Sequence, residues 1–460
     1  MNPVTGAARL LWVREGLGRR DRWSRERLER HQADALGRLR AHALARSPWY
    51  RRTYAGLEDA PLEELPVLTR EDLVAHRDEI VTDPRLRGDV LERWLTDRPT
   101  DPLLGRYWLV ATSGSSGQPL TLPFDEAEWA HVLASFVRGS DWGGLRAGPL
   151  RRVRIATVGT TRAWHMSGRA ALTLPAAWSN TISLDVAEPL DRSVERLNAW
   201  RPNLLVVYPS IAGVLADEQL AGRLSIEPDV VMCGAEVLTA DVRRRVESAW
   251  GARIVDHYAA SETAGIASEC EARRGLHLYE DLLIVEVVDA GNRPVPSGVF
   301  GERLLVTVLF GRTLPLIRYE LHDSVRLAEG WCPCERPYRL LDRVAGRSEE
   351  AISLPGPGGR SVAVHPVVIH GVMDGLRVAG WQVLATPDRL VVRLTGPADP
   401  AMDGRVAADL RTALARAGVA DPSVEIERVA SIDRGPTGKA PLIATVRDDR
   451  RDVVPSGERS

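Results

Sequence analysis

Lys439 is the single lysine of the 460-residue chain, because all the other members of its 60 lysine and arginine residues are arginine. It lies in the glycine-rich segment "DRGPTGKAPL" at 433–442. A lysine ammonium is a compact point charge, whereas the arginine guanidinium is a wide planar fork. Lys439 is therefore a candidate for contact with a phosphate or carboxylate group, and a chance survivor on a solvated loop is the alternative.

A second candidate is the segment "ATSGSSGQP" at 111–119, which follows the apolar run "YWLV". Its backbone N–H groups and hydroxyls suit phosphate oxygens, and its glycines allow the backbone to approach closely. It is not the phosphate loop of NTPases, which requires Gly-Lys-Ser/Thr at the start of a helix. An ordinary surface turn is the alternative.

Three charged residues lie where a nucleotide could be held. Glu262, in "YAASETAG", follows the expected strand "RIVDHY", and a carboxylate at the carboxyl edge of a parallel sheet opposite a phosphate loop could bind Mg²⁺. A Ser-Glu pair at a helix start is the alternative for this segment. Asp323 ends "RYELHD" and could accept two ribose hydroxyls, and Arg347 lies at the expected domain junction.

Three cysteines and a histidine form a candidate metal site. Cys270 and His277 lie in "ECEARRGLHLYED", and Cys332 and Cys334 lie in "GWCPCERP". Such a set can close a tetrahedral structural zinc site. Spacing alone leaves the alternative open, because reduced cysteines are common buried residues and the two pairs lie far apart. Cys233, in an apolar strand, is expected to be a core residue.

The elements that must position these residues follow from the apolar periodicity. Residues 1–80 are expected to be helical, with Thr69 as an N-cap. From about 105 to 260, short apolar runs alternate with helical segments, which is typical of a parallel βαβ sheet. One of these helices, in "TADVRRRVESAWG", is expected to begin after Thr239 and to end at Gly251. After 275 the pattern changes to hairpins.

A smaller unit is expected to begin near residue 347, with a hairpin, a helix and a strand. We therefore predict a large N-terminal α/β domain at 1–346, with mixed and parallel sheets and helices, in which segment 270–334 carries the structural zinc. A small, mobile α+β C-terminal domain would span 347–460 and carry Lys439. About a hundred residues is a common size for a domain.

Composition restricts the class of protein. The apolar content of 44% and the charged content of 27% are ordinary for a soluble globular chain. The net charge of −2 does not favour nucleic acid or an anionic membrane as a partner. Four cysteines are too few for a disulfide framework. No signal peptide or membrane span is evident, so a cytoplasmic location is expected.

Several of these segments, in this order, resemble the adenylate-forming superfamily of acyl-CoA synthetases, most closely its phenylacetate–CoA ligase-like branch. The resemblance covers nearly the whole chain. The segments that carry it are "SPWYRR", "LPVLTREDL", "TSGSSGQP", "CGAEVLT", "HYAASETAG", "PLIRYELHD", "GRSEE" and "PTGKAP". The resemblance implies an adenylate-forming fold and an AMP-forming acid–thiol ligase that uses ATP, Mg²⁺ and coenzyme A.

The resemblance also implies a role for each matching position. The six residues from Thr112 to Gly117 in the phosphate loop would cradle the ATP phosphates. Gly234, Ala235 and Glu236 would line the adenine, Tyr258 would stack on it, and Asp323 would bind the ribose. These nucleotide-binding positions are Thr112, Ser113, Gly114, Ser115, Ser116, Gly117, Gly234, Ala235, Glu236, Tyr258, Ser261 and Asp323.

The remaining implied roles concern catalysis, the hinge and the metal. Glu262 would hold Mg²⁺, Arg347 would assist Asp323, and Lys439 would reach the carboxylate and the α-phosphate from the mobile domain. Glu349 occupies the hinge position, where the family usually has Asp. Some members of this branch carry zinc at the corresponding segments, which favours a structural Zn²⁺ at the Cys/His set.

The resemblance leaves the substrates open. Residues in regions where relatives place the acid are Trp164, His165, Trp178, Tyr208 and His257, and we expect an aryl or arylalkyl acid. Coenzyme A is the expected acceptor, with an amine, nitrite or a carrier-protein thiol as alternatives. A non-catalytic homologue that only binds nucleotide is a further alternative, and a homodimer stays open.

Three departures from the family pattern bear on these roles. Gln118 stands where many relatives carry Lys, and "ELHD" replaces the common "RTGD". The segment "SLPGPGGRSVAVHP" is longer than usual, where relatives contact the thiol acceptor. The second half-reaction is therefore less well defined by the sequence than the first.

Overall fold

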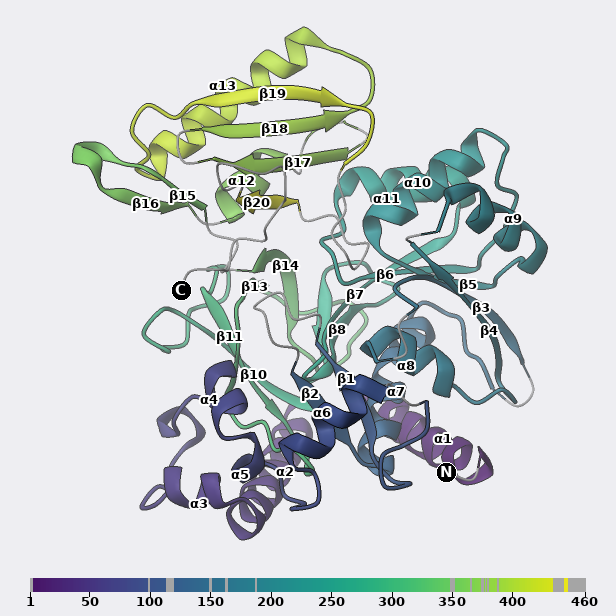
Figure 1. The fold of residues 1–460 in the computed structure, drawn as a ribbon, viewed down its shortest axis with the longest axis vertical. Coiled ribbons are helices and arrows are strands. Elements are labelled where there is room, and N and C mark those ends of the chain that lie inside the picture. Colours follow the sequence, from purple (N-terminus) through teal and green to yellow (C-terminus); the bar gives the residue numbers. More distant parts are fainter. Residues whose placement is uncertain are drawn as a thin grey trace.

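The computed structural model describes the chain apart from residues 1–2, 98–99, 113–119, 149–150, 162–163, 187, 348–351, 365, 374–375, 377, 379, 387–388, 433–441 and 446–460. A large part is built around a nine-stranded sheet, and a smaller C-terminal part contains a four-stranded sheet (Figure 1). Among the described helices, none has the length and apolar character needed to cross a bilayer.

Residues 3–97 are mainly helical, as the apolar spacing predicts. The expected N-cap is confirmed: the Thr69 hydroxyl accepts a hydrogen bond from the Asp72 N–H, and the Asp72 carboxylate accepts one from the Thr69 N–H. This reciprocal pair satisfies two backbone donors at the helix start. The helices are α1 (Pro3–Arg20), α2 (Arg25–Arg46), α3 (Pro48–Thr53), η1 (Leu62–Glu64), α4 (Arg70–Ala75), α5 (Arg77–Ile80) and α6 (Gly88–Asp97).

The nine-stranded sheet has the order β13-β14-β9-β8-β7-β6-β5-β3-β4. The pairings from β4 to β7 are parallel, and those from β7 to β13 are antiparallel. This confirms the change of pattern that the sequence predicts. The strands are β3 (Val153–Gly159), β4 (Ser179–Asp185), β5 (Leu204–Val207), β6 (Val230–Gly234), β7 (Arg253–Ala260), β8 (Ala264–Glu269), β9 (Leu276–Leu278), β13 (Asp323–Leu327) and β14 (Leu340–Arg347).

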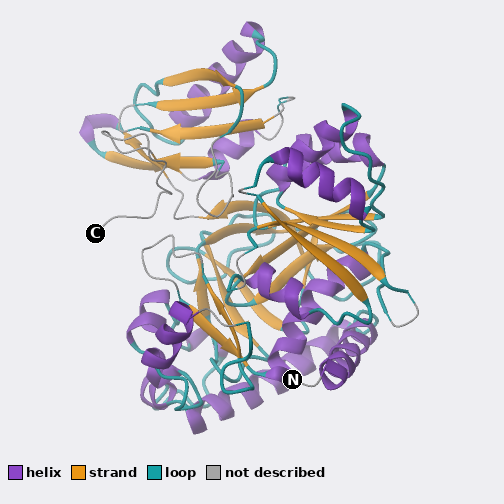
Figure 2. Cartoon of the chain, turned by 45° about the vertical axis from the view of Figure 1, so that its right-hand side comes forward, coloured by secondary structure: helices purple, strands orange, loops and turns teal. Residues whose placement is uncertain are grey.

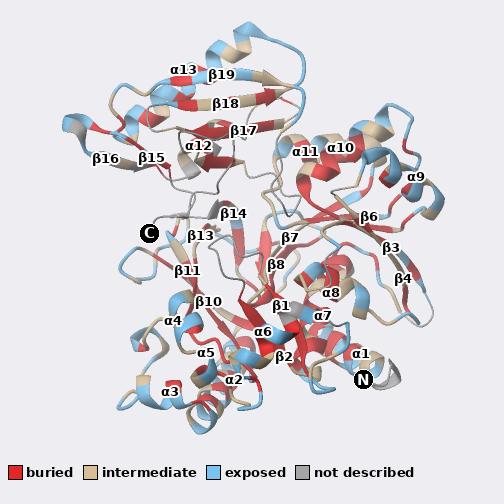
Figure 3. Ribbon diagram, in the orientation of Figure 1, coloured by how far each residue is buried: buried red, intermediate tan, exposed pale blue. Residues whose placement is uncertain are grey.

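Helices cover both faces of the parallel strands, because alternate side chains of a strand point to opposite faces. Ala156 and Val158 of β3 pack with one helix layer, whereas Val153 and Ile155 pack in a separate cluster with Leu145. The strands are correspondingly buried between helices with exposed outer faces (Figure 3). These helices are α7 (Glu126–Trp142), α8 (Met166–Thr173), α9 (Leu190–Trp200), α10 (Pro209–Leu220) and α11 (Ala240–Trp250).

Both predicted ends of α11 are confirmed. The Thr239 hydroxyl accepts a hydrogen bond from the Val242 N–H at 3.3 Å. Gly251 ends the helix with φ 58°, a left-handed conformation that costs glycine little.

Two smaller sheets flank the large one. The hairpin of β1 (Trp108–Ala111) and β2 (Thr121–Phe124) encloses the predicted phosphate loop. The second sheet contains β10 (Leu283–Val288), β11 (Arg303–Val308) and β12 (Tyr319–Leu321). β10 and β11 form the antiparallel pair that the sequence predicts after residue 275.

The C-terminal part forms sheets and a hydrophobic core of its own. Figure 2 shows its strands and helices grouped apart from the large sheet. Together with the large sheet, this part confirms the predicted fold class, while the domain boundary at residue 347 stays a prediction. Its elements are β15 (Ile352–Pro355), η3 (Pro357–Gly359), β16 (Ser361–Val364), α12 (Pro366–Met373), β17 (Gly380–Ala385), β18 (Leu390–Thr395), α13 (Pro400–Arg416), β19 (Val424–Val429) and β20 (Ile443–Thr445).

Candidate functional site

The carboxyl ends of the parallel strands β3, β5, β6 and β7 meet at one edge of the large sheet. Gly234 ends β6 and is paired in register with His257 of β7. The predicted adenine-side segment at 234–236 therefore lies beside the segment that carries Tyr258. Such an edge is where open α/β sheets bind ligands.

The turn after β6 has a backbone that suits small residues. A Cβ at Gly234 would lie 2.9 Å from the carbonyl oxygen of His257, too close for any other residue without a backbone shift. Ala235 has φ 66°, in the left-handed region. Glu236 Oε2 then accepts a hydrogen bond from the Ser210 N–H at 3.0 Å, which fixes the turn to the start of α10.

Glu262 lies in the tight turn between β7 and β8, which pair antiparallel. The alternative interpretation of Ser261 and Glu262 as a helix start is therefore wrong. Thr263 is fully buried, whereas Ser261 and Glu262 are half-buried. The turn thus anchors itself through Thr263 and leaves the two polar residues at the edge of the sheet.

The base of the predicted phosphate loop is closed by three hydrogen bonds. The Thr112 N–H donates to the Leu120 carbonyl, and the Leu120 N–H donates to Thr112 Oγ1, both at 3.0 Å. The Ala111 N–H donates to the Trp164 carbonyl at 2.7 Å. The loop residues Ser113 to Gly117 lie outside the described residues, but their two ends are held together next to a predicted substrate-binding segment.

Asp323 and Arg347 lie opposite each other on neighbouring strands. They are paired in the register of β13 and β14, although they are far apart in the sequence. The structure therefore brings together the backbones of the predicted ribose-binding acid and its assisting arginine. The hinge Glu349 and Lys439 lie outside the described residues.

The predicted substrate residues occupy two places. Trp164 and His165 stack with ring centroids 6.1 Å apart, and Tyr208 follows β5 at the carboxyl edge, where its hydroxyl accepts from the Thr160 N–H at 3.4 Å. Trp178 instead precedes β4 and accepts a hydrogen bond from Val153 at the start of β3. It lies at the opposite edge, so the structure does not group it with the others.

His257 is buried between the strand edge and α7. Burial lowers its pKa to about 4, so its imidazole is neutral at pH 7. Nδ1 lies 3.4 Å from Ser268 Oγ, and the ring packs against Phe136 of α7 with centroids 5.4 Å apart. Gly139 of α7 makes this packing possible, because a Cβ there would approach Ser268 Oγ to 2.9 Å.

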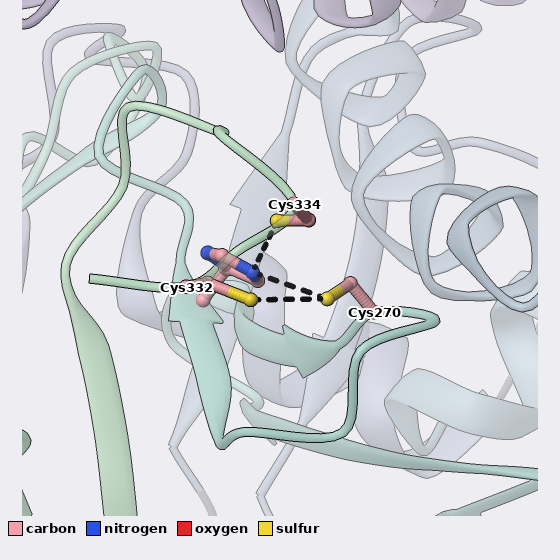
Figure 4. Close-up of side chains that lie close together, drawn as sticks. Cys270, Cys332 and Cys334 are labelled. Carbon is pink, nitrogen blue, oxygen red and sulfur yellow. Dashed lines mark hydrogen bonds between the residues drawn. The ribbon is translucent and has the colours of Figure 1, made fainter.

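The four predicted metal ligands converge, and Figure 4 shows the three cysteines Cys270, Cys332 and Cys334 close together. Cys270 Sγ lies 3.6 Å from Cys332 Sγ and 3.3 Å from His277 Nε2, and Cys334 Sγ lies 3.2 Å from His277 Nε2. All four ligand atoms lie within 4.8 Å of one another. Zinc bonds of about 2.3 Å to sulfur and 2.0 Å to nitrogen give tetrahedral edges of about 3.5–3.8 Å, so the residues fit a tetrahedral metal ion.

The surroundings of this cluster disfavour free thiolates. Burial raises the pKa of the Cys270 and Cys332 thiols and lowers that of His277 to about 4. Two groups favour negative sulfur: the Ala272 N–H donates to Cys270 Sγ at 3.3 Å, and the Arg336 guanidinium interacts electrostatically with Cys334. A bound cation would supply the remaining charge that three thiolates need.

A family model described as AMP-binding enzyme matches residues 70–307, which is more than half of the chain. The chain belongs to the AMP-binding enzyme family. The match includes the segments of Thr112, Gly234, Tyr258 and Glu262, and it ends before Asp323.

Relatives of this family extend the match over most of the chain. A phenylacetate-coenzyme A ligase of Thermus thermophilus is 26% identical over 399 residues, covering 82% of this chain and 81% of the relative. The crystal structure of a 2-hydroxyisobutyryl-CoA ligase in the postadenylation state has a TM-score of 0.72 at 20% identity and covers 92% of this chain and 90% of its own. The structure of the same enzyme with CoA in the thioesterification state has a TM-score of 0.60 at 20% identity and covers 94% of this chain and 92% of its own.

Sequence reasoning within the family missed the residues that support the site. Phe136 packs on His257 but lies on a helix with no motif. Arg336 follows the second cysteine pair by two residues, so a cation close to clustered thiols was the available signal. Arg138, Tyr279 and Tyr338 form a buried group beside His277 that nothing in the sequence links together.

Proposed function

We propose that the protein is an AMP-forming acid–thiol ligase that activates a carboxylic acid with ATP and transfers the acyl group to coenzyme A. In the first step a carboxylate oxygen attacks the α-phosphorus of ATP, and pyrophosphate leaves. In the second step the thiol sulfur attacks the carbonyl carbon of the acyl-adenylate, and AMP leaves. The observation that carries this proposal is the AMP-binding enzyme match over 70–307.

The geometry supports the nucleotide half of the proposal. Gly234, Ala235 and Glu236 would line the adenine, because the β6 turn lies beside β7, which carries Tyr258 as the stacking residue. Thr112 stands at the closed base of the loop that would cradle the phosphates. Asp323, with Arg347 opposite in register, would bind the ribose hydroxyls.

Glu262 is the proposed Mg²⁺ ligand. Mg²⁺ takes oxygen ligands and usually bridges substrate phosphates while keeping several waters. A half-buried carboxylate at the sheet edge suits this, because it leaves room for water and phosphate oxygens. The ion would neutralise charge on the leaving pyrophosphate.

Lys439 is the proposed adenylation lysine, and Glu349 the proposed hinge between domains 1–346 and 347–460. The support is their position in motifs that resemble the family's, together with a C-terminal part that has sheets of its own. Lys439 would place one ammonium between the substrate carboxylate and the α-phosphate, where a guanidinium fork does not fit.

The proposed acid is aryl or arylalkyl, and a cytoplasmic location follows from the need for ATP and coenzyme A. Relatives named phenylacetate-coenzyme A ligase support the acid class, as do the aromatic candidates Trp164 and Tyr208 near the edge. His257 would contribute a neutral imidazole to the pocket wall.

We further propose that the Cys270, His277, Cys332 and Cys334 cluster holds a structural Zn²⁺. Four protein ligands leave no open position for substrate, so the ion would cross-link the chain rather than act on the acid. The convergence of all four ligand atoms within 4.8 Å supports this.

The test is product analysis by mass spectrometry. The protein is incubated with ATP, Mg²⁺ and a panel of aryl and arylalkyl acids, and each of coenzyme A, an amine, nitrite and a carrier-protein thiol is offered as acceptor. We expect acyl-CoA and AMP in equal amounts. An acyl product only with another acceptor would overturn the choice of coenzyme A, and ATP binding without any product would indicate a non-catalytic homologue.

A further inference from the structure

We propose that the metal cluster, when occupied, fastens the N-terminal helices α1 and α2 to the rest of the chain. This inference rests on the proposed structural metal and is independent of the proposed adenylation. The device joins the cluster to the turn between the two helices through one loop and one buried arginine.

The loop between β13 and β14 carries two of the metal ligands and also the tyrosine that contacts the buried arginine. Cys332 and Cys334 lie near its middle, and Tyr338 lies four residues further on. No helix or strand is formed between Leu327 and Leu340, a segment that is described throughout. The two cysteines lie beside Cys270, which directly follows β8, and His277 of β9, so an ion held by these four residues would fix the loop's path.

Tyr338 closes a buried box around Arg138 of α7. The guanidinium lies 4.8–5.0 Å from the ring centroids of Trp142, Tyr279 and Tyr338, and Arg138 is only 3% exposed. It donates to the Tyr338 hydroxyl at 2.6 Å and to Asp281 Oδ1 at 2.7 Å. A buried cation that loses one partner carries a large desolvation penalty, so the box depends on Tyr338 staying in place.

The metal ligand His277 packs against the same box. Its ring meets Trp142 edge-on at 5.6 Å and Tyr338 at 6.5 Å between centroids. The Arg336 guanidinium, which interacts electrostatically with Cys334, lies 4.9 Å from the Trp142 ring centroid. His277 and Arg336 therefore contact both the metal cluster and the side chains of the box.

Asp21, in the turn between α1 and α2, is the other end of the device. Its carboxylate accepts hydrogen bonds from Trp142 Nε1 at 2.8 Å, from the Tyr338 hydroxyl at 3.3 Å and from Arg138. Every one of these donors belongs to the box. Asp21 thus connects the helix turn to Tyr338 of the loop and to two side chains of α7 that pack against Tyr338.

α2 is held to the same loop and the turn before β10. Arg25 donates to Glu280 Oε2 at 2.6 Å and to the Pro337 carbonyl at 3.2 Å. Gln32 donates to the Glu280 carbonyl at 2.8 Å, and Glu280 in turn accepts from the Arg339 N–H at 2.7 Å. Residues 337–339 therefore anchor α2 as well as Asp21.

The test is amide hydrogen exchange on the full chain, with the metal content of each sample measured in parallel. Cys334→Ser removes one ligand, and Cys233→Ala is the matched control, because Cys233 is a fully buried thiol outside the cluster. In Cys334→Ser we expect loss of zinc and exchange of α1 and α2 amides faster by about tenfold or more, with β17 and β18 unchanged. The control should match wild type in both helices and in zinc.

Asp21→Asn tests the other end of the device. It should accelerate exchange in α1 and α2 while the zinc content stays at the wild-type level. Should Cys334→Ser fail to fold, chelator added to the wild-type protein should open α1 and α2 before β17 and β18.

Three results would overturn the inference. The first is amide protection of α1 and α2 in metal-free Cys334→Ser that equals the protection in Cys233→Ala. The second is metal-free wild-type protein in which the amides of these helices stay protected. The third is opening of all elements at the same time after chelation.

Discussion

The proposed metal cluster and the proposed nucleotide-binding edge hold their candidate residues in different ways. Three of the four cluster ligands are buried, and neighbouring rings and hydrogen bonds fix them on all sides. At the sheet edge, Ser261 and Glu262 are half-buried in a turn, and Thr112 stands at the base of a loop. Surrounding side chains therefore hold the ligands of the proposed metal site in place, whereas the proposed nucleotide site would be completed by segments from several parts of the chain.

This difference predicts that substitutions in the cluster lower the stability of the fold, whereas substitutions at the edge lower the rate of the reaction. A residue in the cluster supports the fold whether or not substrate is present, so its loss should appear in the free energy of unfolding. A residue at the edge is proposed to act on the substrates, so its loss should appear mainly in turnover.

Cys332→Ser should give the largest effect, a loss of roughly 4 kcal/mol in the free energy of unfolding, because loss of a structural metal belongs to the most damaging class of change. Metal analysis should fall from about one zinc per chain to none. Activity that remains should keep the wild-type acid preference. Full stability of a metal-free wild-type preparation would show that the cluster is only a group of reduced thiols.

Lys439→Arg should instead leave stability unchanged and slow acyl-adenylate formation by about 10²–10³, or about 3–4 kcal/mol, because a preorganised charge contact to the transition state is lost. The second half-reaction, started from chemically made acyl-adenylate, serves as the control and should be much less affected. Equal loss in both halves would mean a folding defect, and normal adenylation would mean that the single lysine has no role.

His257 should make stability depend on pH, because its folded pKa of about 4 lies below the unfolded value of 6.5. The neutral form is favoured by folding, so the contribution is fully present above pH 6.5 and is lost as pH falls through 4. The loss should approach about 3 kcal/mol.

Urea unfolding of wild type and His257→Gln from pH 7.5 to 4 measures this contribution of His257 to the free energy of unfolding. The difference between the two isolates His257, because the titration of the other groups cancels. A constant difference over this range would show that the imidazole is not held neutral by burial.

Thr69→Ala should have the smallest effect, a loss of about 1 kcal/mol of unfolding free energy through the helix cap. Thr412→Ala is the control: Thr412 is exposed in α13, and its hydroxyl bonds the Ala408 carbonyl within the same helix. Urea unfolding measures the free energy of unfolding of both variants. Equal losses in the two variants would contradict the capping role of Thr69.

The sequence predicted best what depends on local pattern. The cap at Thr69, the ends of α11 and the strand that buries Cys233 follow from residue types a few positions apart. The change from parallel to antiparallel pairing after β7 also follows from the change in spacing.

Long-range packing explains most of what sequence could not give. The turn at Ser261 and Glu262 has the residues of a helix start, and only the pairing of β8 with β7 excludes one. Trp178 is aromatic like the edge residues, but the strand direction places it at the opposite edge. The box around Arg138 combines residues more than a hundred positions apart.

Activation of a carboxylic acid with ATP is the proposed reaction on which the other roles depend. The most direct measurement is exchange of labelled pyrophosphate into ATP, with and without each acid of an aryl and arylalkyl panel, on protein shown to be folded by thermal unfolding. We expect exchange that requires both Mg²⁺ and an acid and that falls strongly in Glu262→Gln. Absence of exchange with every acid, in protein that is folded and binds ATP, would contradict it.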